Sequence, residues 1–190
     1  MRKAEIKRKT NETDIYAEIN LDGRGVGKID TGIGFLDHML ALFARHGRFD
    51  LTVKCTGDLQ VDGHHTVEDV GVCLQAVGEK RGICRYGFTV LPMDEALILT
   101  AVDLSGRAYL GYGLDIRAGK VGDFDTELAE EFFYAFVRSA ECTLHVKQLS
   151  GSNAHHIIEG AFKSFARSLR RAVATESGFE DEIPSTKGVL

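Results

Sequence analysis

Several features are scarce in this sequence, and each absence excludes a class of protein. The 190 residues include no tryptophan, two prolines and four cysteines that stand singly, so neither a disulfide framework nor a zinc ribbon is indicated and a reducing, cytoplasmic location is expected. No apolar run approaches the roughly 20 residues that cross a bilayer, and no apolar stretch follows the charged N-terminus, so we expect neither a membrane partner nor a signal peptide. Excess basic charge is also lacking. With 23 Lys and Arg against 28 Asp and Glu, the net charge of −5 argues against nucleic acid as a partner.

The remaining composition is that of one globular domain spanning residues 1–190, with 44% hydrophobic and 27% charged residues. Alternating apolar residues predict strands, and apolar residues at helical spacing predict helices. The expected strands are 14–21, 49–55, 96–104, 108–112 and 143–149, with further short strands between 83 and 112. The expected helices are 35–46, with Gly47 as its stop, one starting near His64, 125–139 and 154–174.

A weak internal repeat organises these elements. LDHMLALFARHGRFDLTVKC followed by HHTVED resembles LAEEFFYAFVRSAECTLHVKQ followed by HHIIEG. His38 precedes His64 by 26 residues, and Glu131 precedes His155 by 24, so His38 and Glu131 occupy matching positions. The pattern predicts a duplicated unit with halves of about 5–90 and 91–180 around a pseudo-twofold axis. Such alternation favours an α+β (α/β sandwich) fold in which helices pack on sheets.

Each half contains one His-His-x-x-Glu motif, and this motif indicates metal binding. On a helix the first His and the Glu share a face, whereas the second His points about 100° away. A single such pair is usually an ordinary surface feature, but two copies in a repeat, each preceded by a polar donor, favour ligands. The donors are His64, His65, Glu68, His155, His156, Glu159, His38 and Glu131, which divide into two sites of four ligands. Mixed imidazole and carboxylate ligands suit Mn²⁺, Fe²⁺ or Zn²⁺.

Other polar residues indicate an anionic substrate. In a chain without a P-loop, the candidate phosphate-binding groups are Arg85, Arg107, Lys163, Ser185, Thr186 and Lys187. The residues alone therefore indicate a dimetal enzyme acting on a small phosphorylated compound. A dimetal phosphatase and a metal-storage or metal-sensing module are the alternatives. His145, unpaired on a predicted strand, is expected to have a packing role, and His46 could simply complement a helix dipole.

Longer motifs carry a resemblance to a known family. GFLDHML, DGHHTVEDVG, DLSGRAYL, TLHVKQLSGSNAHHIIEGAFKSFARSLRRAV and IPSTKG resemble the imidazoleglycerol-phosphate dehydratases of histidine biosynthesis, over a match from about Arg8 to Gly188. The resemblance implies two βαβ-type halves related to the ribosomal protein S5 domain 2 fold, with helices on mixed sheets. It also implies a homo-oligomer of 24 subunits built from trimers, with active sites at subunit interfaces and two Mn²⁺ in each.

The resemblance assigns roles to individual residues. One metal would take His38, His65, His155 and Glu159, and the other His64, Glu68, Glu131 and His156. The family's phosphate-binding positions match Arg85, Arg107, Lys163, Ser185 and Lys187, and a substrate-contacting position matches His46. Its acid/base carboxylate, which also contacts substrate, matches Glu12, and further catalytic positions match the ligands His38, Glu68 and Glu159.

The implied reaction dehydrates D-erythro-1-(imidazol-4-yl)glycerol 3-phosphate to 3-(imidazol-4-yl)-2-oxopropyl phosphate. It would pass through a dimetal-bound imidazolate and a diazafulvene-like intermediate, with Glu12 moving protons. Two departures from the family pattern stand out. Glu131 occupies a position where many relatives have His, and Gln75-Ala76-Val77 stands where relatives carry about five more helical residues. We expect this shortening to affect helix packing and assembly more than coordination.

Overall fold

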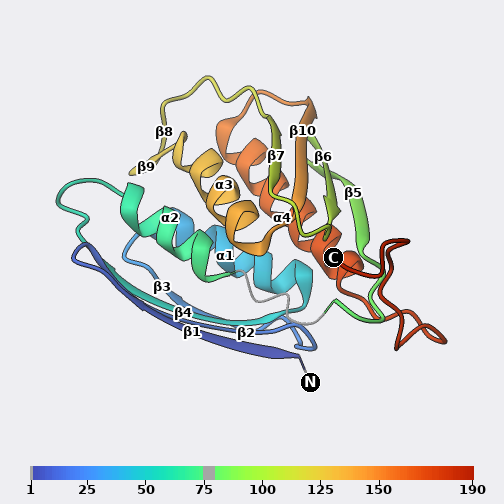
Figure 1. The fold of residues 1–190 in the computed structure, drawn as a ribbon. Helices are drawn as coiled ribbons and strands as arrows, with labels where there is room; N and C mark the ends of the chain where they lie inside the picture. The colour runs from blue at the N-terminus through green and yellow to red at the C-terminus, as the bar shows by residue number, and fades with distance from the viewer. Residues whose placement is uncertain (1, 75–79) are drawn as a thin grey trace.

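The computed structural model describes residues 2–74 and 80–190. In these residues two four-stranded sheets enclose four helices, which form the middle of the molecule (Figure 1). This arrangement confirms the predicted α+β sandwich of helices packed on mixed sheets. The expected shortening at Gln75-Ala76-Val77 lies outside the described residues.

The first sheet is built from the N-terminal part of the chain, in the order β1-β2-β4-β3. Its strands are β1 (Lys3–Lys9), β2 (Thr13–Asn20), β4 (Asp50–Gly57) and β3 (Gly27–Asp30). Neighbouring strands pair antiparallel except β3 and β4, which run parallel because helix α1 (Gly34–Gly47) connects them. Alternate side chains of β2, such as Ile15 and Ile19, are buried on the face toward the helices.

The second sheet repeats this connection order as β5-β6-β10-β7. Its strands are β5 (Tyr86–Met93), β6 (Ala96–Asp103), β10 (Thr143–Ser150) and β7 (Tyr109–Gly113). Again only the last pair, β7 and β10, is parallel, and helix α3 (Leu128–Ala140) lies in the connection between them. A small hairpin, β8 (Lys120–Val121) and β9 (Phe124–Asp125), is inserted before α3. Strand β5 spans the boundary expected near residue 90 and pairs with β6, so the second unit begins at Tyr86.

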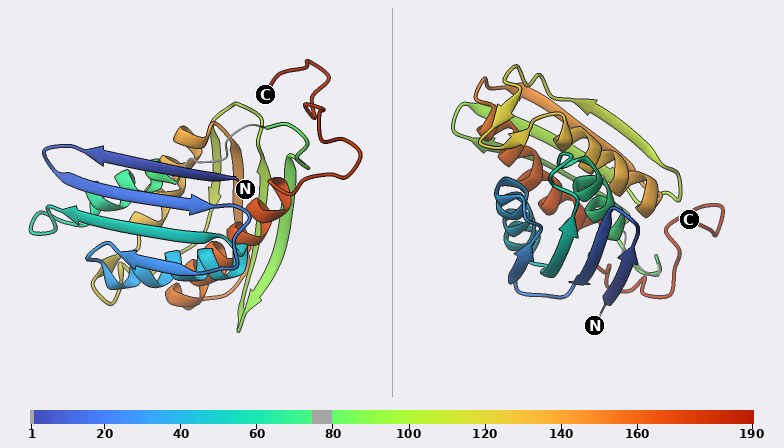
Figure 2. Two further views of the ribbon diagram at one scale, coloured as in Figure 1. Left: turned by 90° about the horizontal axis from the view of Figure 1, so that it is seen from below. Right: turned by 90° about the vertical axis from the view of Figure 1, so that its left-hand side faces the viewer.

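The helices form two pairs between the sheets (Figure 2). Helices α1 and α2 (His64–Cys73) cover the first sheet, and α3 and α4 (Ala154–Ala172) cover the second. Across the middle, α1 packs on α4 and α2 packs on α3, so each helix of one half meets a helix of the other. Gly71 permits the close approach of α2 to α3, since a Cβ there would lie 2.9 Å from Ala135 Cβ. This crossed pairing brings the two His-His-x-x-Glu motifs toward the opposite half.

The core between the helices is filled by phenylalanine rings. Phe165 of α4 is fully buried, and its ring centroid lies 5.4 Å from that of Phe43, 5.6 Å from Phe133 and 5.0 Å from Phe136. These contacts join α1, α3 and α4. Aromatic rings of this kind combine a large buried apolar area with favourable edge-to-face geometry.

Replacing Phe165 by alanine is therefore expected to lower the free energy of unfolding by about 3–5 kcal/mol, because the transfer free energy is lost and a cavity remains. Urea unfolding of the metal-free protein measures this change. Phe179→Ala is the control, since Phe179 is 49% exposed and its removal should change stability by less than about 0.5 kcal/mol. Similar losses in both variants would contradict the central position of Phe165.

Several sequence-based boundaries were wrong, for identifiable reasons. The helix expected from residue 125 begins at Leu128, because Phe124 and Asp125 form β9 and Phe124 packs its ring 5.1 Å from Phe35. At the end of α1 the left-handed residue is Arg48 (φ 55°), one position after the expected Gly47. Position 47 needs glycine for a different reason, because a Cβ there would lie 2.4 Å from the ring of Phe49.

None of the helices in the described part of the chain combines the length and the apolar composition that a membrane-spanning helix needs.

Candidate metal and catalytic site

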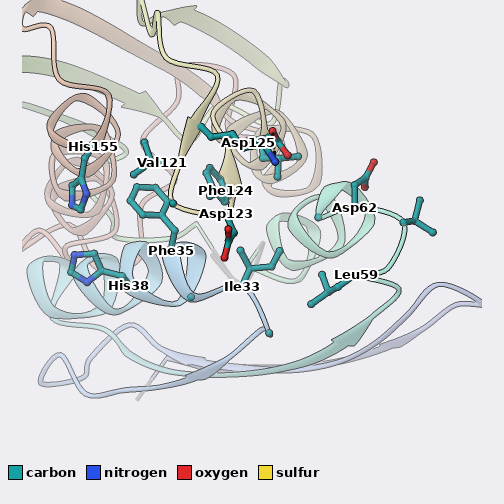
Figure 3. Close-up of a pocket in the computed structure, with 17 residues that line it drawn as sticks. Ile33, Phe35, His38, Leu59, Asp62, Val121, Asp123, Phe124, Asp125 and His155 are labelled. Atoms are coloured by element: carbon teal, nitrogen blue, oxygen red, sulfur yellow. Dashed lines mark ion pairs between the residues drawn. The ribbon is translucent and has the colours of Figure 1, made fainter.

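Three predicted metal ligands meet where α1 packs on α4. Glu159 Oε2 lies 3.0 Å from His155 Nε2 and 3.6 Å from His38 Nε2. One potential ligand atom from each residue lies within 4.8 Å of the other two. Figure 3 shows the rings of His38 and His155 side by side at one end of a pocket. We call His38, His155 and Glu159 the α1–α4 group.

Local structure fixes this group. His155 and Glu159 stand four residues apart on the first turns of α4, where the side chain of Asn153 accepts a hydrogen bond from the His156 N–H at 3.2 Å and caps the helix. On α1, Asp37 accepts hydrogen bonds from the Thr31 N–H (2.8 Å) and hydroxyl (2.6 Å), which fixes the turn that carries His38.

The carboxylate of the α1–α4 group is held in its charged form. Burial alone would raise the pKa of Glu159, but the Lys163 ammonium, which hydrogen-bonds Oε1, and the ring of His155 bring this pKa below its ordinary value. Glu159 is only 6% exposed. A buried, ionised oxygen donor beside two imidazole nitrogens is suited to a divalent cation.

A second pair lies where α2 packs on α3. His64 Nε2 is 3.7 Å from Glu131 Oε2, and Glu68 follows His64 by one helical turn. This pair is the counterpart of the α1–α4 group, because α2 corresponds to α4 and α3 to α1 in the repeat. Glu131 therefore faces His64 as His38 faces His155. We call His64, Glu68 and Glu131 the α2–α3 group.

The second histidine of each motif points away from these groups. His65 Nδ1 lies 3.0 and 3.2 Å from the carboxylate oxygens of Asp58, and its Nε2 lies 3.8 Å from Glu12 Oε1. His156 Nδ1 lies 2.7 Å from Glu95 Oε2. Within one chain, the sets of four predicted for each metal are therefore incomplete: His65 is apart from the α1–α4 group, and His156 is apart from the α2–α3 group.

Asp58 and Glu95 were missed by the sequence reasoning. Hydrogen bonding to Asp58 raises the pKa of His65, and hydrogen bonding to Glu95 raises that of His156. The hydrogen bond between Glu95 and His156, together with the bonds that Glu95 accepts from the N–H groups of Asn153 and Ser152, lowers the pKa of Glu95 to about 2. The repeat contains a signal that could have found Glu95, since it directly precedes β6 as Glu12 directly precedes β2.

The predicted phosphate-binding residues fall in two places. Arg85 donates to Asp103 at 2.7 and 3.2 Å and to the Pro184 carbonyl at 2.8 Å, which anchors the C-terminal segment containing Ser185, Thr186 and Lys187. Arg107 lies in the loop after β6, and its Nη1 is 3.4 Å from the Ser105 carbonyl.

Lys163 and His46 lie elsewhere, on the α1 and α4 side of the core. Lys163 belongs to the surroundings of the α1–α4 group through Glu159. His46 lines a pocket of about 270 Å³ with Arg167, Arg170 and Arg171. Its pKa is lowered by burial and by the charges of Lys163 and Arg167.

A larger pocket of about 730 Å³ opens beside the α1–α4 group (Figure 3). His38 and His155 form one end of it, and the start of α1, the loop at 59–63 and the β8–β9 hairpin form the rest. Its other charged side chains are Asp62, Asp123, Asp125 and Lys120. Among the described residues, no predicted phosphate-binding side chain lines this pocket. Its three aspartates would repel a phosphate.

Comparisons with known proteins identify the family and the fold. The profile of the family described as imidazoleglycerol-phosphate dehydratase matches residues 31–169. The imidazoleglycerol-phosphate dehydratase of Desulforamulus reducens is 57% identical over 194 residues, covering 100% of this chain and 98% of that protein. Crystal structures of the enzymes from Pyrococcus furiosus (40% identity, TM-score 0.84, 97% of this chain and 100% of that one) and Staphylococcus aureus (38%, 0.83, 92% and 99%) have the same fold.

Proposed function

Since the chain belongs to the imidazoleglycerol-phosphate dehydratase family, hydro-lyases of histidine biosynthesis, we propose that it carries out this dehydration with two Mn²⁺ per active site. The observation that supports the metals is the α1–α4 group, with three potential ligand atoms within 4.8 Å of one another, together with the His64–Glu131 pair at 3.7 Å in the corresponding place of the other half. A structural role for the histidines would not require both halves to retain these donors. Four unpaired cysteines, all in the described part of the chain, support a cytoplasmic location.

The residues fit the proposed ions. The α1–α4 group offers two imidazole nitrogens and a carboxylate oxygen within 4.8 Å, without a competing thiolate. In the α2–α3 group Glu131 supplies an oxygen donor, which favours a hard ion such as Mn²⁺. When bound, the ions would supply Lewis acidity that favours the imidazolate form of the substrate and so assists departure of the neighbouring hydroxyl.

The protein's own groups would do the rest. The side chain of Glu12, at the β1–β2 turn, is 53% exposed, and its Oε1 lies 3.8 Å from His65 Nε2, the nitrogen that would hold a metal. We assign it removal of the C–H proton on the carbon next to the one that loses hydroxide, and return of that proton to the ring-side carbon of the enol. The proton that the enol hydroxyl gives up balances the departed hydroxide, so that the ketone and water are formed. Arg107, Lys163 and Lys187 would bind the phosphate, while Arg85 anchors the segment that carries Ser185 and Lys187.

The reaction itself tests this function. Protein loaded with Mn²⁺ should convert the phosphorylated imidazole diol to the ketone without releasing inorganic phosphate, and the chelated protein should be inactive. Product absorbance and a phosphate assay separate the two outcomes. Phosphate release in place of ketone would identify a phosphatase and overturn the proposal.

We further propose that the active sites are completed between subunits of a homo-oligomer, a 24-mer built from trimers as in the family resemblance. This is supported by the incomplete ligand sets of the single chain, in which His65 lies apart from His38, His155 and Glu159. Binding of the shared ions would then stabilise the assembly.

Mixing two inactive variants measures this sharing. Suppose that His155 and His65 of one site come from different chains. Random co-assembly of equal amounts of H155A and H65A subunits should then restore about a quarter of wild-type activity, because about one site in four receives both intact histidines. Each variant alone should remain inactive. No recovery in mixed assemblies that native mass spectrometry shows to be formed would contradict shared sites.

A further inference from the structure

We propose that Asp58 and Glu95 are positioning residues, each holding the second histidine of one motif through Nδ1 so that Nε2 is presented to a metal. This inference rests on the proposed dimetal function. A neutral imidazole that donates from Nδ1 has its lone pair on Nε2, and carboxylates commonly fix metal-binding histidines in this way. The geometry is seen twice, at 3.0 Å between Asp58 and His65 and at 2.7 Å between Glu95 and His156.

Backbone hydrogen bonds hold the carboxylate of Glu95 and the turn that carries Asp58. Glu95 Oε1 accepts hydrogen bonds from the N–H groups of Asn153 (2.9 Å) and Ser152 (3.3 Å), so Oε2 remains for the ring of His156. The N–H of Asp58 donates to the Glu12 carbonyl at 3.1 Å, which joins the turn after β4 to the β1–β2 turn. Glu95 is thus fixed through its carboxylate, and Asp58 through the turn on which it lies.

The two halves reach this arrangement from different positions. Glu95 stands at the position equivalent to Glu12, directly before the second strand of its sheet. In the first half Asp58, directly after β4, holds the ring, whereas the position directly after β10 is Gly151, which has no side chain. Because Asp58 occupies Nδ1 of His65, Glu12 is left on the Nε2 side at 3.8 Å. The duplicated carboxylates have therefore diverged: Glu95 orients a ligand, and Glu12 is free for proton transfer.

Asp94 provides a matched control for Glu95. It is adjacent in the same turn, its side chain is 72% exposed, and its Oδ2 lies 3.7 Å from His156 Nε2, beyond hydrogen-bond distance. Replacing it by asparagine removes the same charge from the same turn without breaking the bond to Nδ1.

The test measures Mn²⁺ affinity from the electron paramagnetic resonance signal of the free ion. Glu95→Ala and Asp58→Ala should each weaken one of the two Mn²⁺ sites by about 10–100-fold. Asp58→Asn, which keeps an acceptor oxygen for Nδ1 of His65, should recover most of this loss, and Asp94→Asn should lose much less affinity than Glu95→Ala. Glu95→Ala also removes hydrogen bonds to Ser152 and Asn153 at the start of α4, whereas Asp58→Ala does not. A loss of affinity in Asp58→Ala therefore reports ring orientation without a change in helix capping.

A second readout reports the ring directly. In the chelated protein labelled with ¹⁵N-histidine, the wild type and Asp58→Asn should show His65 protonated at Nδ1, whereas Asp58→Ala should shift the proton toward Nε2. Unchanged affinity in both alanine variants, or equal loss in Asp94→Asn, would overturn the inference while leaving the dimetal function intact. A wild-type protein that binds no Mn²⁺ would instead overturn the proposed function.

Discussion

Replacing His155 by alanine is expected to release one of the two proposed Mn²⁺ ions and to lower kcat by at least about 10³-fold, since Lewis-acid stabilisation contributes several kcal/mol. His155 lies at the centre of the α1–α4 group, 3.0 Å from Glu159 and with its ring centroid 6.0 Å from that of His38. Its removal leaves the buried carboxylate of Glu159 with Lys163 and His38 beside it. His64→Ala should have the equivalent effect on the α2–α3 group.

Metal content and turnover of the same preparation measure this effect. His145→Ala is the control, because His145 lies on β10 against the ring of Tyr109, at 5.4 Å, and over Gly111. This variant should keep both ions and most of the activity. Equal metal content in H155A and wild type would remove His155 from the ligand set.

Replacing Glu12 by glutamine is expected to lower kcat by about 10²–10⁴-fold, the usual contribution of a general acid/base. Metal content and KM should stay near their wild-type values, because Asp58 rather than Glu12 orients His65. The substitution retains the size of the side chain and removes only its capacity to exchange a proton.

Steady-state kinetics together with Mn²⁺ titration separate the possible roles of Glu12. A loss confined to kcat fits proton transfer. Loss of Mn²⁺, or a raised KM with unchanged kcat, would show that Glu12 holds a metal or the substrate and would contradict the assignment.

Much of this fold could be predicted from periodicity. The alternation of β2 and β4 and the apolar stripe of α4 are strong because each element has one face in the core. Edge strands β1 and β3 were missed. Strand β1 carries only Ala4 and Ile6 on its inner side among charged residues, and β3 has four residues with one large aliphatic side chain, Ile29. Such short or charged edges bury too little apolar surface to produce a clear pattern.

The candidate site divides in the same way. Helical spacing correctly places His155 and Glu159 on one face and sends His156 elsewhere. The repeat relates His38 to Glu131, and the structure has them on the corresponding helices α1 and α3. The crossed pairing places His38 beside the His-His-x-x-Glu motif of α4 and Glu131 beside that of α2. It depends on how the helices pack, which the sequence pattern does not contain. The roles of Asp58 and Glu95 depend on where strands end, which a linear pattern does not contain.

Anomalous diffraction at the manganese edge, from crystals grown with Mn²⁺, decides whether the two donor groups hold ions. We expect two peaks per chain, one bounded by His38, His155 and Glu159 and the other by His64, Glu68 and Glu131, with Nε2 of each histidine toward the ion. A single peak, or peaks remote from these imidazoles, would contradict this expectation.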